Sequence, residues 1–145
     1  MTRILGIDYG SKRVGLAISD GLGLTAQPLE VVSRSTAVER ILQLVSDHDV
    51  ETVVVGLPTG LSGGEGVSAT EARALGAQLA SEDLDVEYID ERFTSRIAED
   101  VLLESGMKRR DRRDTVDKVA AAIILQGYLD RRARGNSNPG NPGVH

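Results

Sequence analysis

The 145-residue chain contains no cysteine, no tryptophan and only two histidines, His48 and His145. These absences exclude disulfides and zinc sites built from thiolates or several imidazoles. Any bound metal ion must therefore be held by oxygen atoms, which favours Mg²⁺ or Mn²⁺. The apolar runs are too short to span a membrane, and the N-terminal residues lack the pattern of a signal peptide. We expect a cytoplasmic protein that does not enter a membrane.

Aromatic residues make up only 3% of the sequence, and the net charge is -5. Base stacking is therefore not expected to dominate any recognition of nucleic acid. The positive charges are nevertheless concentrated, because Lys108-Arg109-Arg110-Asp111-Arg112-Arg113 alone contains five of them. Such a block is either a solvated linker or an electrostatic footprint for phosphates. Both interpretations remain open at this point.

Asp8 ends the first apolar run of the chain and is followed by a glycine turn at Gly10. A buried carboxylate is costly unless it is hydrogen-bonded, neutralised or bound to a metal ion. Two distant acids could share a cation with Asp8: Glu91, which follows a later strand, and Asp117, near the start of the last helix. Alternatively, Asp8 caps the tight turn through its side chain.

Short apolar runs separated by turn residues predict five strands. The first three, over residues 3–9, 14–20 and 25–32, are close enough in sequence to form an antiparallel meander, and two more are expected over 52–58 and 85–90. Two helices are expected from capping boxes, in which Thr36 precedes Glu39 and Ser68 precedes Glu71. Two further helices are expected over 94–104 and from Asp114 or Thr115 onward.

This order of elements predicts an α/β fold with a mixed five-stranded sheet, three antiparallel then two parallel strands, flanked by helices. Residues 1–134 have the size of one domain, and residues 135–145 have the composition of a disordered tail. Sites in such sheets form beyond the carboxyl ends of parallel strands, where Asp8 and Glu91 are expected. Alternation in a strand sends Asp90 and Glu91 to opposite faces, so only one of them should face the site.

Four motifs, taken in order, resemble those of the YqgF/RuvX family, Holliday-junction-resolvase-like proteins also described as candidate pre-16S rRNA nucleases. They are Gly6-Ile7-Asp8-Tyr9-Gly10 with Arg13-Val14-Gly15-Leu16-Ala17, Val55-Gly56-Leu57-Pro58, Asp90-Glu91-Arg92-Phe93-Thr94-Ser95, and Val116-Asp117-Lys118-Val119-Ala120-Ala121. The resemblance extends over residues 3–130, which is almost the whole of the expected domain.

The resemblance implies a ribonuclease H-like fold and metal-dependent hydrolysis of phosphodiester bonds. It implies that Asp8, Glu91 and Asp117 are the catalytic and metal-binding residues. Two cations about 4 Å apart could then hold the attacking and leaving oxygens. The basic residues expected to contact substrate phosphates are Lys12, Arg13, Arg109, Arg110, Arg112 and Arg113. The family often has a lysine shortly before the last acid, and arginine is not equivalent to lysine at a phosphate.

The expected substrate is structured nucleic acid, either the 5′ end of a pre-16S rRNA precursor or branched DNA. Symmetric cleavage of a DNA junction would require a homodimer. One alternative is a non-catalytic nucleic-acid-binding module that keeps the fold without the chemistry. Another is an ATPase, because Asp8–Gly15 also resembles a phosphate loop of sugar kinases and actin, although those proteins need two lobes to enclose the nucleotide.

Overall fold

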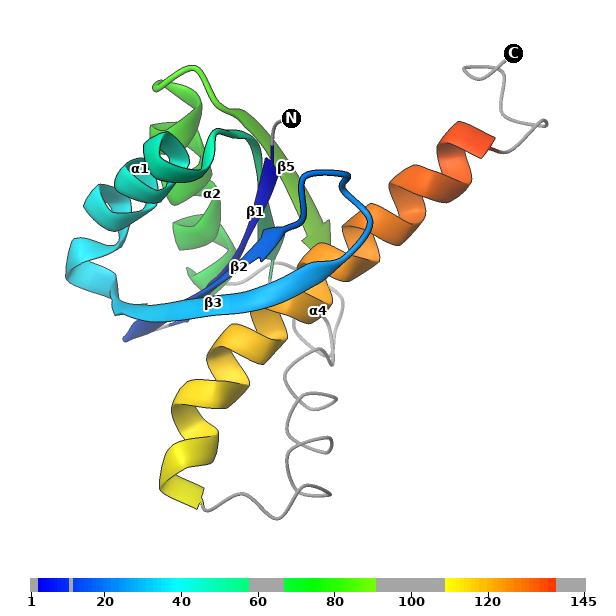
Figure 1. Ribbon diagram of the computed structural model, residues 1–145. Coiled ribbons are helices and arrows are strands. Elements are labelled where there is room, and N and C mark those ends of the chain that lie inside the picture. The colour runs from blue at the N-terminus through cyan, green and yellow to red at the C-terminus, as the bar shows by residue number, and fades with distance from the viewer. Residues whose placement is uncertain (1–2, 11, 58–66, 91–108, 138–145) are drawn as a thin grey trace.

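A computed structural model describes residues 3–10, 12–57, 67–90 and 109–137 of the chain (Figure 1). The strands are β1 (Arg3–Tyr9), β2 (Arg13–Ser19), β3 (Ala26–Ser33), β4 (Val50–Leu57) and β5 (Asp85–Asp90). The helices are the 3₁₀ helix η1 (Arg34–Thr36) and the α-helices α1 (Ala37–His48), α2 (Val67–Ala80) and α4 (Arg109–Ser137). The predicted helix over 94–104 lies outside the described residues.

The strands form one five-stranded sheet in the order β3-β2-β1-β4-β5. Strand β2 is antiparallel to both β1 and β3, whereas β4 is parallel to both β1 and β5. This arrangement confirms the mixed sheet predicted from the sequence. Strand β1 is central, and its residues Ile4–Asp8 are all buried because helices cover both faces.

Helices α1 and α2 cover one face of the sheet, and α4 crosses the other face (Figure 1). Successive strand residues alternate between the two faces. Leu5 and Ile7 of β1 accordingly pack in the core under α1 and α2, whereas Ile4 packs in the core under α4. The second core also contains Val54, Ile89, Ala121, Ile124, Leu125 and Leu129.

Gly6 is the point at which α4 comes closest to β1. A Cβ built on Gly6 would lie 2.8 Å from the Cβ of Leu125 and 3.0 Å from the carbonyl oxygen of Ala121. A side chain at this position would therefore push the helix away from the sheet. The absence of one allows α4 to pack directly on the strand that carries Asp8.

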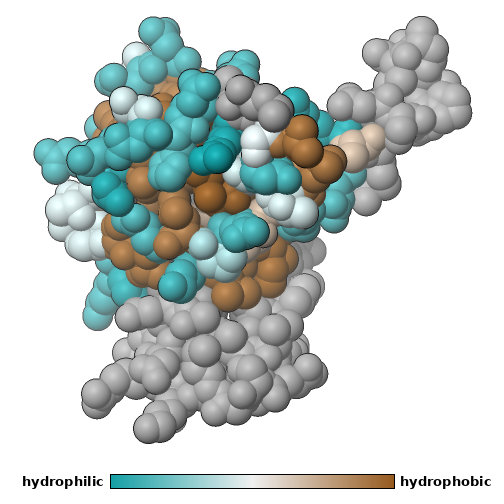
Figure 2. Space-filling model, in the orientation of Figure 1, coloured by the Kyte–Doolittle hydropathy of each residue, from teal (hydrophilic) through white to brown (hydrophobic). Residues whose placement is uncertain are grey.

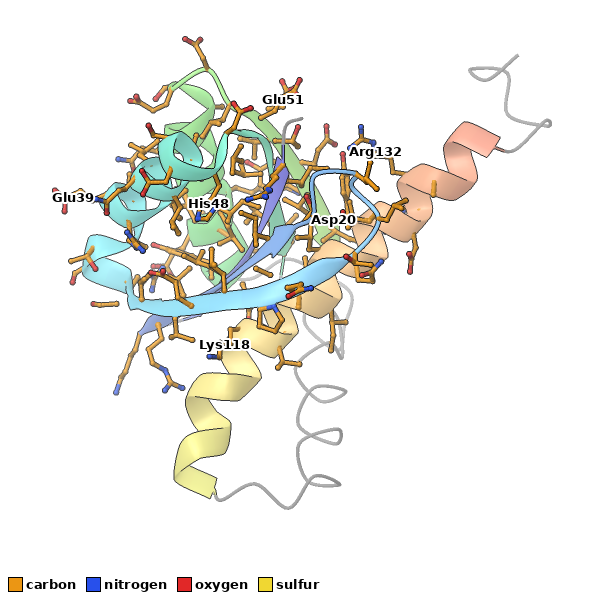
Figure 3. All side chains as sticks on the ribbon, viewed as in Figure 1. Asp20, Glu39, His48, Glu51, Lys118 and Arg132 are labelled. Atoms are coloured by element: carbon orange, nitrogen blue, oxygen red, sulfur yellow. The ribbon has the colours of Figure 1, made fainter. Side chains whose placement is uncertain are left out.

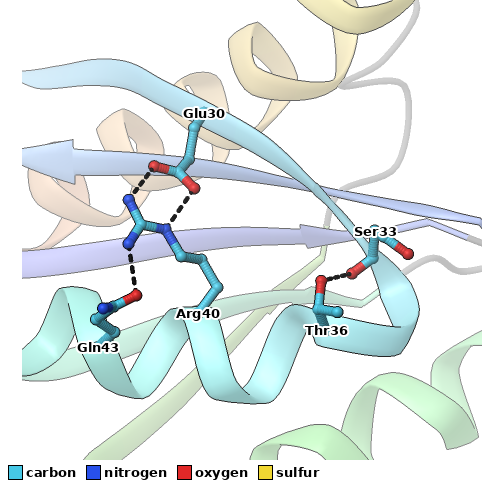
Figure 4. A network of polar contacts seen from close by, with 5 residues as sticks. All are labelled: Glu30, Ser33, Thr36, Arg40 and Gln43. Atoms are coloured by element: carbon cyan, nitrogen blue, oxygen red, sulfur yellow. Dashed lines mark hydrogen bonds and ion pairs between the residues drawn. The ribbon is translucent and has the colours of Figure 1, made fainter.

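The predicted capping box at the start of α1 is wrong. Thr36 precedes α1 but makes no side-chain capping bond; its hydroxyl donates instead to the carbonyl oxygen of Ser33 at 3.3 Å (Figure 4). The 3₁₀ turn η1 comes first, and the hydroxyl oxygen of Ser33 accepts from the backbone N–H of Ser35. Ser33 thus caps the 3₁₀ turn, and Thr36 at the start of α1 makes no side-chain cap bond.

The predicted capping box of α2 is also wrong in its register. Helix α2 begins at Val67, so Ser68 lies inside the helix rather than before it. Glu71, the second member of the expected box, forms an ion pair with Arg34 at 2.7 Å. Glu71 therefore interacts with Arg34, which is far away in the sequence, instead of with the nearby Ser68.

Helix α4 begins at Arg109, so the basic block is helical from that residue onward and the predicted start at Asp114 or Thr115 is wrong. Arginine favours helix, and no glycine or proline interrupts the segment before Gly127, so nothing local stops the helix from extending. The helix continues to Ser137, which makes the first residues of the expected tail helical. Within the described ranges, no helix has the length and apolar character needed to cross a membrane.

Candidate active site

Asp8 lies near the carboxyl end of β1 and is only 9% exposed. Among the residues whose burial is described, it is the single buried side chain that can carry a charge. It lies directly opposite Gly15 of β2, and residues paired in this way share a face of the sheet. Because Gly15 has no side chain, β2 places no side-chain atoms beside the Asp8 carboxylate at this point.

Asp8 shares its face of the sheet with α4. Alternation along β1 puts Ile4, Gly6 and Asp8 on this face, and Gly6 contacts the helix at Ala121 and Leu125. Toward the other end of β1, Ile4 and Leu129 line one cavity. Helix α4 therefore runs backward along β1, and its earlier residues lie toward Asp8.

Asp117 belongs to the stripe of α4 that faces the sheet. Ala121, Leu125 and Leu129 are buried at intervals of four residues, and residues at this spacing share one face of a helix. Asp117 precedes Ala121 by the same interval. The helix backbone thus places residue 117 on the approach to the end of β1, while the Asp117 side chain lies outside the part that the structure describes.

The connection between β1 and β2 brings two predicted phosphate ligands close to Asp8 in the chain. Lys12 is exposed in this turn and Arg13, half-buried, begins β2. The backbone N–H of Gly10 donates to the carbonyl oxygen of Arg13 at 2.9 Å. A Cβ on Gly10 would lie 2.6 Å from that oxygen, so the tight turn alone accounts for the glycine.

The remaining predicted site residues are described in part or not at all. Glu91 lies outside the described residues, immediately after Asp90, which ends β5 opposite Leu57 of β4. The side chain of Asp90 is not described either. The four arginines of the predicted phosphate site are in the first turns of α4, where only their backbone is described: Arg109, Arg110, Arg112 and Arg113.

Arg34 joins this end of the fold and was not identified from the sequence. Its guanidinium lies 4.3 Å from the centroid of the Tyr9 ring and pairs with Glu71 at 2.7 Å. The hydrogen bond to Tyr9, together with the charge of Glu71, raises the pKa of Arg34. Its backbone N–H also donates to the carbonyl oxygen of Lys12 at 3.1 Å. No local pattern could reveal these contacts, because the partners are far apart in sequence.

Lys118 is a second residue with no role assigned from the sequence. It follows Asp117 directly and is half-buried. Figure 3 shows it on α4, on the side of the sheet where β1 ends. Its charge therefore adds to that of Lys12 and Arg13 at this end of the molecule.

The chemistry of the donor set fits a hard divalent cation. The described residues contain no group of three or more potential metal-ligating side chains. The side chains of Glu91 and Asp117 lie outside the described part. Asp8 itself suits such a site in its chemistry, since it is a carboxylate near the carboxyl end of β1. Oxygen donors of this kind suit Mg²⁺ or Mn²⁺ rather than zinc.

Comparison with solved structures defines the class of fold. The structure of RuvC from Thermus thermophilus in complex with a Holliday junction substrate aligns with a TM-score of 0.58 at 19% sequence identity. The alignment covers 92% of this chain and 96% of that one. At this identity the likeness shows the fold, which is ribonuclease H-like, as the sequence resemblance implied.

Comparison of sequences defines the family. Residues 2–131 match the family model described as RuvX, Holliday junction resolvase. The chain is 44% identical over 137 residues to the "Putative pre-16S rRNA nuclease" of Lactococcus lactis subsp. cremoris strain SK11, covering 90% of this chain and 96% of that protein. A protein of the same name from Pelotomaculum thermopropionicum is 44% identical over 150 residues, 97% of each chain. The chain therefore belongs to the RuvX (YqgF) family.

This membership confirms the resemblance predicted from the four motifs. It supports a nuclease, that is, a hydrolase acting on nucleic acid. It also decides against the sugar-kinase-like alternative, because the match extends over nearly the whole expected domain.

Proposed function

We propose that the protein is a metal-dependent nuclease that cleaves structured RNA and matures the 5′ end of pre-16S rRNA in the cytoplasm. The names of its relatives support the substrate. The main observation in favour of metal-dependent hydrolysis is the position of Asp8, which is buried near the carboxyl end of β1 on the face that α4 crosses. In sheets of this class, binding and catalytic sites form beyond the carboxyl ends of the strands, which is where Asp8 lies.

Asp8, Glu91 and Asp117 would hold Mg²⁺ or Mn²⁺. In β5, Ile89 packs on the α4 face, so continued alternation would direct residue 91 to that same face and Asp90 away from it. Asp117 follows the sheet-facing stripe of α4 toward the same edge. When bound, divalent cations would stabilise the charge that develops on the attacking and leaving oxygens during phosphodiester hydrolysis.

The residues around this edge would bind and orient the substrate. Lys12 and Arg13 lie in and after the turn that follows β1. The arginines at the start of α4 precede Asp117 on the helix whose earlier residues lie toward Asp8. Such cations contact phosphates without reading sequence. Arg34 has a different role, because its guanidinium is engaged by Tyr9 and Glu71 and would hold the end of β1 in place.

Cleavage of branched DNA is the second candidate function. The description of the matching family as a Holliday junction resolvase favours it. Symmetric cleavage of a four-way junction needs two active sites related by a two-fold axis, so this function would require a homodimer. A nuclease that matures an RNA end needs no such symmetry.

A cleavage assay separates these functions. The full chain is incubated with RNA that carries the 5′ precursor of 16S rRNA, with linear duplex DNA, or with a four-way DNA junction, in Mg²⁺, Mn²⁺ or chelator. We expect cleavage of the RNA that requires the metal. Preferred cleavage of the junction would favour the resolvase, and nucleic-acid binding without any cleavage would favour the non-catalytic module.

A further inference from the structure

A cavity of about 690 Å³ lies at the end of the sheet opposite to Asp8. Its walls come from the first residues of β1, β4 and β5, the turn between β2 and β3, and the last part of α4. We call it the N-edge groove and define it by Leu22, Leu24, Glu51, Asp85, Glu87 and Tyr128. In Figure 3, Asp20, Glu51 and Arg132 lie around this end, whereas Lys118 lies toward the other.

The groove exposes apolar surface. Leu22 is 67% exposed and Leu24 is 60% exposed, and they are the exposed large hydrophobic residues in the described part of the chain. Figure 2 shows hydrophobic surface among hydrophilic surface on the side where the β2–β3 turn approaches α4. Single exposed leucines are common, but these two lie in one turn and together present apolar surface at the groove that a partner could cover.

The turn that carries the leucines is held by a set of hydrogen bonds. The backbone N–H of Leu24 donates to Oδ1 of Asp20 at 2.8 Å, and the backbone N–H of Asp20 donates to the carbonyl oxygen of Thr25 at 3.0 Å. Gln126 of α4 ties this turn to the helix, donating to the carbonyl oxygen of Leu24 at 3.0 Å and accepting from the backbone N–H of Ala26 at 2.9 Å. The backbone of the turn is thus preorganised, which lowers the entropy cost of binding a partner.

The charged residues of the groove indicate which kind of partner it favours. Glu51, Asp85 and Glu87 are exposed at its rim, whereas Arg132 supplies one positive charge. Burial, followed by the charge of Glu87, raises the pKa of Tyr128, so its phenol remains neutral. An excess of carboxylates repels phosphates and attracts lysine and arginine. Nucleic acid is therefore disfavoured in this groove.

We propose that the N-edge groove docks a basic segment of a partner protein, which places an apolar side chain against Leu22 and Leu24 and pairs lysine or arginine with Glu51 and Glu87. We choose a basic partner because its charge would complement that of the groove, and a protein segment because the exposed leucines on the held turn offer apolar surface for a side chain. The groove and the candidate active site lie at opposite ends of the sheet, so both can be occupied together. The proposal does not depend on the nuclease function.

Binding of a defined probe tests the proposal. The probe is a fluorescein-labelled, amidated peptide of alternating lysine and leucine, measured by anisotropy at physiological ionic strength, with a lysine/serine peptide and a glutamate/leucine peptide for comparison. Only the lysine/leucine peptide should bind well, because the groove offers both apolar and acidic surface. Equal binding of the lysine/serine peptide would show that charge alone attracts the probe and would overturn the proposal.

Variants locate the binding to the groove. Leu22→Ser/Leu24→Ser should weaken probe binding about tenfold, since the serines offer the probe no apolar surface to bury, and Leu22→Met/Leu24→Met should restore it. Glu51→Lys/Glu87→Lys should also weaken binding about tenfold. The matched control Glu39→Lys/Asp47→Lys, with the same change in charge at exposed positions of α1, should change binding by less than about twofold. Equal losses in the control and groove variants would overturn the proposal.

Two further outcomes would assign the groove to another occupant. A dimer in sedimentation that Leu22→Ser/Leu24→Ser abolishes would show that a second copy fills the groove. Protection of Leu22 and Leu24 amides by RNA, measured by hydrogen exchange, would show that the groove binds substrate. Either result would overturn the proposal of a basic protein partner, whereas a monomer with protection by the peptide alone would support it.

Discussion

Gly6 of β1 and Leu125 of α4 are packed so closely that a Cβ on Gly6 would lie 2.8 Å from the Cβ of Leu125. This contact joins α4 to the strand that carries Asp8, and it lies two residues before Asp8 on the same face. Because an α-helix is stiff over a few turns, the contact also determines where residue 117 lies along β1. The geometry of the candidate site thus depends on Gly6, a residue that lies outside the site and has no side chain.

Gly6→Ala should destabilise the fold, because the added methyl group would meet Leu125 and the carbonyl oxygen of Ala121. Overpacking of this kind costs about 1–3 kcal/mol of unfolding free energy, which urea denaturation measures. Gly127→Ala is the matched control, since a Cβ there would lie 3.8 Å from the Cδ1 of Ile89. It should leave stability unchanged or raise it by up to about 1 kcal/mol through helix propensity. Equal effects of the two substitutions would contradict the close packing at Gly6.

Asp8→Asn should abolish metal-dependent cleavage while the protein remains folded. The amide keeps the shape of the side chain but removes the charge that would hold the cation. We expect turnover to fall at least about a hundredfold. Removing a residue that only hydrogen-bonds to a metal ligand already costs up to about a hundredfold, and Asp8 would be a ligand itself. Asp47→Asn, at an exposed position of α1, is the control and should cleave like the parent. Normal turnover in the Asp8 variant would reject its catalytic role.

Arg109→Ala/Arg110→Ala should weaken substrate binding equally for different sequences, because phosphate contacts carry no sequence information. A plot of log affinity against log salt should become shallower by roughly 0.7–0.9 for each phosphate that the variant no longer neutralises. Arg131→Ala/Arg132→Ala removes the same charge from the other end of α4 and serves as the control. If both pairs changed the slope alike, net charge rather than a phosphate site would explain the binding.

Arg40→Met should destabilise the fold in a pH-dependent way. Arg40 donates to both carboxylate oxygens of Glu30, at 2.7 and 2.8 Å (Figure 4), and this hydrogen bonding lowers the pKa of Glu30. A carboxyl group whose pKa falls on folding stabilises the protein above its unfolded pKa, and this contribution disappears as pH falls through the folded pKa. The substitution should cost about 0.5–1 kcal/mol at pH 7, as expected for a partly exposed pair.

The destabilisation caused by Arg40→Met should shrink between pH 7 and an acidic pH below the lowered pKa of folded Glu30, because the carboxyl group is then protonated in the folded and unfolded protein alike. Denaturation at both pH values measures the difference, with Arg131→Met as a control at an exposed position. A destabilisation of the same size at both pH values would show that Arg40 acts through its packing and not through its charge.

Strand positions can be predicted well from the sequence, because apolar runs and turn residues are local signals. The strand predicted over residues 85–90 is β5, which has those bounds. Helix starts are predicted poorly, because they depend on competing partners. Thr36 bonds back to Ser33 and Glu71 pairs with Arg34, and neither partner can be read from a four-residue motif.

The sequence predicts at which strand and helix ends the candidate site residues lie. It does not predict how these ends are arranged in space. The order of apolar runs indicates that Asp8 ends a strand, and β1 confirms that position. The approach of α4 to β1 depends on the fit of Gly6 to Leu125 across the core, for which the sequence has no local signal. The N-edge groove has no local signal either, because its walls come from five separate segments.

The proposed active site requires Asp8, Glu91 and Asp117 to bind the same cations. The most direct test is Mn²⁺ binding to the full chain, followed by electron paramagnetic resonance, in the parent and in Asp8→Asn, Glu91→Gln and Asp117→Asn, with Asp47→Asn as the control. Each of the three substitutions should weaken Mn²⁺ binding and cleavage together, and the control should change neither. Parent-like Mn²⁺ affinity and cleavage in any one of the three would contradict the claim.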